Sequence, residues 1–258
     1  TTAAGINGDS FSVGGFFFDS VDARIAHRAP SGRVELLVRQ GEQRDYLVKG
    51  AYLFDPDRRE ARIADLTVRF DTTLWKLTHE AQVRWRPDAI EVADLELRNG
   101  SNGRIYANGD LPRHGEARLD VAVDNFQTGD LLDLLESDFE LTGLATLHAT
   151  VRGSLTSPRL NGAFGLVSGV YRGTSVPDLH GTFQYANRSL TANVDAVRSG
   201  NLAMAHVEAH IPVDLSIGVP GTPGGGPKQR LLDAPLAVDI NADSLPLELI
   251  PYLTDALE

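Results

Sequence analysis

The stretches SPRLNGAFGL (157–166) and VPDLHGTFQY (176–185) share the pattern Pro-x-Leu-x-Gly-x-Phe-x-Leu/Tyr. Alternate residues of a β-strand point to the same face, so each stretch places a leucine, a glycine and a phenylalanine in one apolar row. A glycine inside a strand costs stability and leaves a gap in that row. Because the same gap occurs twice, we expect these glycines to serve the architecture of a sheet.

Glycines recur on the apolar side of other predicted strands. The set comprises Gly50, Gly109, Gly143, Gly162 and Gly181. Such glycines let a sheet curl sharply or let another molecule approach its backbone. The alternative is that they only mark the corners of a closed sandwich or barrel.

Composition narrows the functions that the chain can have. It has 258 residues, of which 42% are hydrophobic and 23% charged, no cysteine, and a net charge of −11. The lack of cysteine excludes disulfides and thiolate metal sites, and the negative charge argues against nucleic acid and anionic membranes as partners. No apolar run approaches the ~18 residues of a membrane-spanning helix. The first residues lack the basic and apolar regions of a signal peptide, so any export signal would lie outside this sequence.

Period-2 alternation of apolar and polar residues predicts an all-β fold built on a long antiparallel sheet. We assign residues 1–215 to its main part, interrupted by a short helix at about 128–136. In AIEVADLELR (89–98) the apolar phase slips between Val92 and Leu95. A slip of this kind predicts a β-bulge near Ala93–Asp94.

The last part of the chain continues the same pattern after a break. Residues 216–230 are rich in glycine and proline and predict a flexible loop, and residues 231–258 predict a further strand and a short helical segment. LDVAVDN (119–125) is echoed by LAVDINA (236–242), and each precedes a leucine-rich segment. We therefore expect the chain to be a piece of a longer repetitive protein.

The apolar faces of about a dozen strands have to be covered, and two short helices cannot cover them. Either the sheet packs on itself, or it curls into a half-pipe whose hydrophobic groove meets an apolar ligand. Aliphatic residues interspersed with small ones favour the half-pipe. The side chains expected to line this groove are Val121, Val123, Leu141, Leu147, Val151, Leu160, Phe164, Leu166, Leu179, Phe183, Tyr185, Leu190, Val194, Val207, Ile211, Val238 and Ile240.

No catalytic or cofactor-binding motif stands out, so we expect neither an enzyme nor a cofactor. His206 and His210 lie four residues apart on a predicted strand, which is ~13 Å and too far for a shared metal. The turn DPDRRE (55–60) lacks the ligands of a calcium loop and is expected to be solvated. Trp75 and Trp85 could form a platform for carbohydrate, but Trp85 alternates with apolar residues and is expected to join the groove lining.

Two glycine-centred segments, GSLTSPRLNG (153–162) and PDLHG (177–181), resemble the repeats of TamB-like proteins and, more distantly, AsmA-like proteins. The segment 74–112, with its Trp-x-Leu entry and strands that end in Gly-x-Leu, is similar to the same family. The likeness covers most of residues 60–215.

This resemblance implies a long envelope protein of diderm bacteria that is anchored in the inner membrane and crosses the periplasm. It implies a folded-over sheet, the β-taco, whose groove carries phospholipids between the inner and outer membranes. For TamB-like members it also implies a role in outer-membrane protein assembly with a barrel partner. The family has no catalytic residues, and its anchor and barrel-docking parts are not in this sequence.

The leading hypothesis is therefore a segment of a bridge-like conduit for phospholipid acyl chains. The alternative is a β-sandwich for protein interaction or adhesion, without lipid transport. An apolar trough with free sheet edges could equally chaperone unfolded strands.

Overall fold

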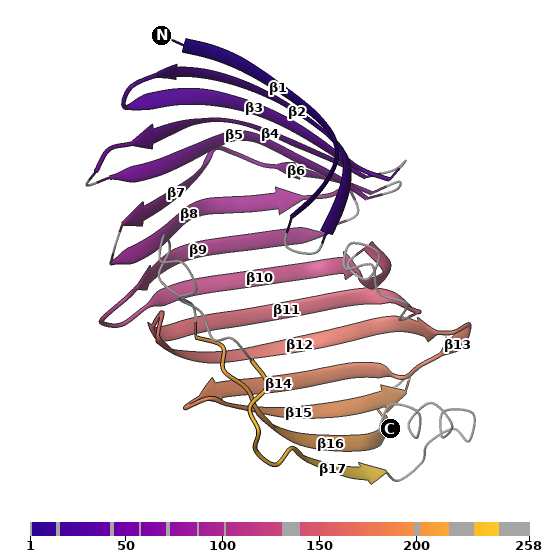
Figure 1. The fold of residues 1–258 in the computed structure, drawn as a ribbon. Coiled ribbons are helices and arrows are strands. Elements are labelled where there is room, and N and C mark those ends of the chain that lie inside the picture. Colours follow the sequence, from indigo (N-terminus) through magenta and orange to yellow (C-terminus); the bar gives the residue numbers. More distant parts are fainter. Residues whose placement is uncertain are drawn as a thin grey trace.

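The structure, a computed structural model, describes residues 2–13, 16–41, 44–56, 58–70, 73–86, 88–100, 102–130, 140–198, 202–216 and 230–242. These residues form one antiparallel sheet of seventeen strands, and the predicted curled all-β fold is confirmed (Figure 1). A sandwich needs two sheets packed face to face, whereas the described residues form a single sheet.

The first half of the sheet contains long strands and one strand that is broken in two. Its strands are β1 (Thr2–Val13), β2 (Phe16–Arg28), β3 (Ser31–Gln40), β4 (Arg44–Phe54), β5 (Arg59–Phe70), β6 (Thr73–Leu77), β7 (Ala81–Arg86), β8 (Ala89–Arg98) and β9 (Arg104–Pro112). Both β6 and β7 pair with β5 on one side and with β8 on the other, so together they fill a single position in the sheet.

The second half continues the same up-and-down order. Its strands are β10 (Arg118–Gln127), β11 (Leu141–Ser154), β12 (Ser157–Tyr171), β13 (Thr174–Ser175), β14 (Asp178–Ala186), β15 (Ser189–Arg198), β16 (Leu202–Pro212) and β17 (Ala237–Ala242). Within the described ranges, β1 pairs with β2 alone and β17 with β16 alone, so both strands leave one edge free.

Only a small part of the two predicted helical segments falls within the described residues. Residues 128–130 are helical at the end of β10, and the remainder of the predicted helix at 128–136 lies outside the described residues. The glycine- and proline-rich segment at 216–230 is described only at Ser216 and Arg230, and the predicted helical segment after β17 is not described.

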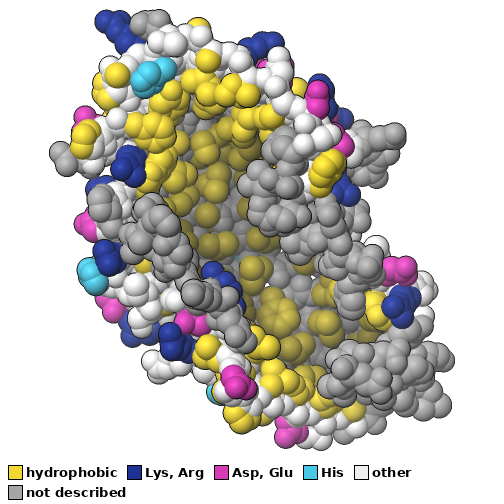
Figure 2. All heavy atoms as spheres, viewed as in Figure 1, with side chains coloured by type: hydrophobic (Ala, Val, Ile, Leu, Met, Phe, Trp, Pro, Cys, Tyr) yellow, Lys and Arg dark blue, Asp and Glu magenta, His cyan; other side chains and the backbone are white. Residues whose placement is uncertain are grey.

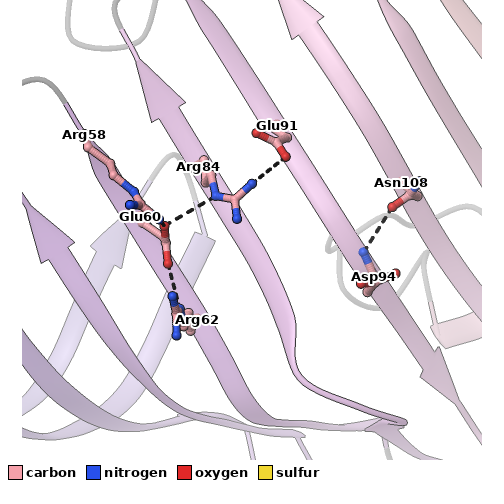
Figure 3. A network of polar contacts seen from close by, with 7 residues as sticks. All are labelled: Arg58, Glu60, Arg62, Arg84, Glu91, Asp94 and Asn108. Carbon is pink, nitrogen blue, oxygen red and sulfur yellow. Dashed lines mark hydrogen bonds and ion pairs between the residues drawn. The ribbon is translucent and has the colours of Figure 1, made fainter.

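Bulges interrupt the regular pairing and help the sheet to curl. The register shifts between β8 and β9 after Val92, and Asp94 takes a φ of 58°, which confirms the bulge predicted near Ala93–Asp94. The backbone N–H of Asp94 donates to Oδ1 of Asn108 at 3.2 Å across this bulge (Figure 3). Further shifts occur in the pairs β4–β5, β10–β11, β11–β12 and β15–β16.

The curl of the sheet brings β10 against β5 and β6, where their side chains form a packed cluster. The ring of Phe126 at the end of β10 stacks on Trp75 of β6 at 5.4 Å and meets Phe70 of β5 edge-on at 6.4 Å. Trp75, which the sequence left unassigned, is only 1% exposed. Phe70, Trp75 and Leu97 therefore form a small closed core, with half-buried neighbours from β4 to β10 around it.

A second packed cluster lies where strands turn at the opposite ends. Leu155, in the β11–β12 turn, is 1% exposed and packs with Leu111 and Ala117. Its backbone N–H donates to the carbonyl of Pro112 at 2.9 Å, which ties two neighbouring turns together. Trp75 and Leu155 are the two large side chains that are fully buried among the described residues. Most of the apolar face thus lies outside any closed core.

The polar face is held by cross-strand ion pairs. Glu60 of β5 is 3% exposed and meets Arg58 at 2.6 Å, Arg62 at 2.7 Å and Arg84 of β7 at 3.4 Å (Figure 3). Arg84 also contacts Glu91 of β8 at 2.7 Å. The expectation of a solvated turn at 55–60 was wrong for Glu60, because β5 already begins at Arg59 and three arginines cover the carboxylate.

Candidate functional site

Register aligns apolar side chains into rows that run across the strands on one face. Directly opposed residues lie on the same face of an antiparallel pair, so a row can be followed from strand to strand. One row crosses from β10 to β17 through Val123, Leu147, Phe164, Gly181, Val194, Val207 and Ile240. The row beside it runs through Val121, Ala149, Gly162, Phe183, Ala192, Ala209 and Val238.

Two flanking rows widen this apolar strip. One contains Leu119, Val151, Leu160, Tyr185, Leu190 and Ile211. The other contains Phe126, Ala145, Leu166, Leu179, Ala196, Ala205 and Ala242. Of the seventeen residues that the sequence named together as the groove lining, sixteen fall in these four rows, and Leu141 does not. Trp85, also expected at the groove, lies on β7 outside these rows. Leu141 lies beyond a bulge and pairs with Tyr171 of β12.

The strip forms the floor of an open groove. Figure 2 shows hydrophobic side chains gathered over the hollowed face of the molecule. Most of the lining side chains are half-buried, and Leu166 and Tyr185 are buried. At the β17 edge, Val238 and Ile240 keep 43% and 45% of their surface exposed. Exposed and half-buried apolar rows of this extent are typical of a surface that receives an apolar partner.

The repeated glycines of the opening motif lie beneath aromatic rings. Gly162 opposes Phe183, and Gly181 opposes Phe164, so each motif covers the glycine of the other. A Cβ atom at Gly181 would lie 2.5 Å from Cζ of Phe164, and one at Gly162 would lie 2.5 Å from Cζ of Phe183. The two rings are 6.4 Å apart and tilted by 40°. The rings thus lie low on the groove floor instead of standing into the groove.

The other three predicted glycines, Gly50, Gly109 and Gly143, do not lie under a phenylalanine ring. At Gly50 and Gly109 a Cβ atom would collide with the backbone carbonyl of the adjacent strand, of Arg62 and Arg118 respectively. Gly109 also takes a φ of 138°, which side-chain-bearing residues rarely adopt. These glycines let strands approach closely where the sheet bends, and Gly143, with a φ of 147°, lies at the β11–β12 bulge.

The opposite face carries the polar residues. His206 pairs with Asp195 at 2.7 Å, and His148 pairs with Asp124 at 2.6 Å. His210 instead contacts the hydroxyl of Ser189 at 3.1 Å. No group of three or more metal-ligating side chains gathers within the described ranges. This face is therefore a hydrated exterior with local ion pairs.

One end of the groove is crossed by the segment after β16. The backbone N–H of Leu215 donates to the hydroxyl of Tyr185 at 2.8 Å, and Arg188 pairs with Asp214 at 2.9 Å. Hydrogen bonds from Ser216 lower the pKa of Asp214, burial acts against them, and the Arg188 charge lowers it further. An ionised Asp214 therefore holds this segment against the β14–β15 turn.

Along the rim of the first strands, aromatic rings contact one another in a line that sequence reasoning missed. His27 of β2 stacks on Tyr52 of β4 at 5.9 Å, Tyr52 meets Phe54 at 5.0 Å, and Phe54 meets Trp85 of β7 at 5.8 Å. We call these four residues the aromatic rim. Trp85 was expected at the groove, but the contacts among these rings were not predicted, because the partners of a ring across strands depend on register.

No protein-family model, curated protein or solved structure matches this chain. None of the helical residues in the described ranges belongs to a helix long and apolar enough to span a membrane. The function therefore has to be argued from the groove itself. An apolar, elongated and unspecific surface can bind alkyl chains.

Proposed function

We propose that this chain is a segment of a bridge-like protein that conducts phospholipids, with their acyl chains in the apolar groove and their headgroups in water. The observation that carries the proposal is the continuity of the four rows, which run from β10 to β16 and, in three of the four, on to β17. In each row, apolar residues or glycines lie opposite one another on successive strands, and no charged or amide side chain interrupts them.

Energetics support a continuous groove for this task. Moving an acyl chain of about 16 carbons through water exposes apolar surface worth about 0.8 kcal/mol per methylene, or about 12 kcal/mol in all. Many similar weak contacts remove this barrier without trapping the chain in one place. Strands about 4.8 Å apart give a groove of tens of ångströms, longer than a single binding pocket requires.

The resemblance to TamB-like and AsmA-like repeats supports the same proposal and extends it. In that setting the segment works in the periplasm of a diderm bacterium, within a parent anchored in the inner membrane. A further role in outer-membrane protein assembly, next to a barrel partner, is part of this proposal. Among the described residues, β1 and β17 each have one unpaired edge, which favours this role because an exposed strand edge can pair with an incoming strand.

Binding of a neutral amphiphile tests the proposal. Dodecyl maltoside, kept below its critical micelle concentration, is titrated into the protein in a calorimeter. Phe183→Glu places a carboxylate on the groove floor and should weaken binding about tenfold, since apolar contact is lost and a charge must be desolvated.

The matched control introduces the same charge one residue away. Gln184 is exposed on the polar face, and Gln184→Glu should leave binding unchanged. Leu147→Arg and His148→Arg form a second pair of the same design. Unchanged binding in both groove variants, with a native circular dichroism spectrum, would refute the proposal.

A further inference from the structure

We propose that Arg59 binds the anionic headgroup of a lipid whose acyl chain lies in the groove. This inference rests on the proposed function and names the class of its substrate, an anionic amphiphile. It depends on three features of Arg59, which lies beside the aromatic rim: the face on which it lies, its lack of an ion pair with any described residue, and the rings on either side of it.

Arg59 lies on the groove face and not on the polar face. Its Cα partners are Phe54 of β4 and Trp85 of β7, and Trp85 in turn opposes Ile90 of β8. Ile90 opposes Leu111, a member of the second packed cluster. Arg59 is thus the charged member of an otherwise apolar row at the end of the strands.

Basic residues near Arg59 form ion pairs, whereas Arg59 forms none among the residues that the structure describes. Arg58 contacts Glu60 at 2.6 Å, and Arg86 contacts Asp88 at 3.6 Å. Arg59 is exposed and has no ion pair with a described residue. The nearby carboxylates of Glu60 and Asp88 are engaged by other arginines. Charges more than about 8 Å apart are largely screened at physiological ionic strength, so the more distant acidic residues of the chain act only weakly on Arg59.

The rings beside Arg59 match the boundary between an acyl chain and its headgroup. The rings of Phe54 and Trp85 approach to 5.8 Å although their strands are separated by β5, and Phe54 is 52% exposed. Tyr52 adds a hydroxyl that contacts Nδ1 of His27 at 3.0 Å. Aromatic side chains with one apolar and one polar end favour such boundaries. A guanidinium group next to them can hold a phosphate through two parallel hydrogen bonds.

Two amphiphiles with the same alkyl chain provide the test. Dodecyl phosphate is anionic and dodecyl maltoside is neutral, and both are titrated below their critical micelle concentrations. Wild-type protein should prefer dodecyl phosphate. Arg59→Gln should weaken binding of dodecyl phosphate about threefold to tenfold, because solvent screens a charge contact at an exposed site, and it should leave binding of dodecyl maltoside unchanged.

Matched variants separate this site from general electrostatics. Arg33 is an exposed arginine that opposes Ala51 on the polar face, and Arg33→Gln should retain the anionic preference. Arg59→Lys keeps the charge but cannot make two parallel hydrogen bonds, so it should retain only part of the anionic preference. Inorganic phosphate alone should neither bind nor compete, because the alkyl chain supplies most of the affinity.

Each contrary result has its own meaning. Equal losses in Arg59→Gln and Arg33→Gln, or no loss in Arg59→Gln, would overturn the headgroup site and leave the groove intact. Failure of the wild-type protein to bind either amphiphile would overturn the site and the proposed function together.

Discussion

The ring of Phe164 lies over Gly181, its direct partner across β12 and β14. Phe183 and Gly162 repeat the relationship with the strands exchanged. A phenylalanine that covers a cross-strand glycine shields the glycine backbone and lies flat on the sheet, which offsets the instability of glycine in a strand. The repeated motif therefore builds a low groove floor from two strands that each supply one ring and one gap.

A methyl group at Gly181 should disturb this arrangement. Its Cβ would lie 2.5 Å from Cζ of Phe164 and 2.8 Å from the carbonyl oxygen of Asn193, so the ring and a backbone have to move. Overpacking of this kind should lower the free energy of unfolding of Gly181→Ala by about 1–3 kcal/mol. Urea unfolding followed by circular dichroism measures the loss.

Two further variants test whether the contact with Phe164 causes the stability loss of Gly181→Ala. Nothing lies within 4 Å of a Cβ atom at Gly5 of β1, so Gly5→Ala should change stability by less than about 0.5 kcal/mol. Phe164→Leu combined with Gly181→Ala should be less destabilised than the sum of the single variants. Additive effects would show that the ring and the glycine are not coupled.

The carboxylate of Glu60 should make stability depend on pH. Burial raises its pKa, but hydrogen bonds from Arg62, Arg58 and Gln82 outweigh burial and lower it from 4.5 to about 2. Because the folded pKa is depressed, the stabilisation is complete above about pH 5 and is lost as the pH falls towards 2. Glu60→Gln should therefore unfold about 1–3 kcal/mol more easily at pH 7, and the difference should vanish near pH 2.

Glu35 supplies the comparison for Glu60. It pairs with Lys49 at 3.2 Å, and its side chain is 43% exposed. Glu35→Gln should cost less than about 1 kcal/mol, because exposed pairs contribute little. A difference between wild type and Glu60→Gln that stays constant from pH 7 to pH 2 would contradict the ionised network.

The bulge at Asp94 should tolerate glycine and reject a β-branched residue. The φ of 58° is open to glycine, acceptable for aspartate and strained for valine. Asp94→Val should lower the free energy of unfolding by about 1–2 kcal/mol, and Asp94→Gly should stay close to wild type. Similar losses in both variants would indicate that the aspartate side chain, and not the backbone geometry, matters here.

The period of two in the apolar residues, and the positions where its phase changes, were sufficient to predict much of this fold. Alternation gave the strands, because one face is apolar and the other polar, and the slip from Val92 to Leu95 located the bulge at Asp94. The lining residues could be chosen for the same reason, since every second residue of a strand has to share a face. Leu141 fell outside the rows because a bulge in the β11–β12 pair separates it from them.

The register between strands could not be predicted from the sequence. The Phe–Gly contacts, the position of Arg59 and the burial of Trp75 all depend on that register. That Phe164 meets Gly181, and Phe183 meets Gly162, follows from turn lengths and bulges which no single strand reveals. Arg59 was assigned to a solvated turn because its neighbours are charged, although it opens β5 between two aromatic residues. Trp75 is buried because the ring of Phe126, from β10, stacks on it.

Site-specific photo-crosslinking to phospholipid tests the central claim most directly. A benzophenone amino acid replaces Phe183 on the groove floor or Gln184, its exposed neighbour on the polar face, and the protein is irradiated with phospholipid vesicles. Our account predicts lipid adducts at position 183, detected by mass spectrometry, and none at position 184. Equal adducts at both positions, or adducts at position 184 alone, would contradict a groove that holds acyl chains.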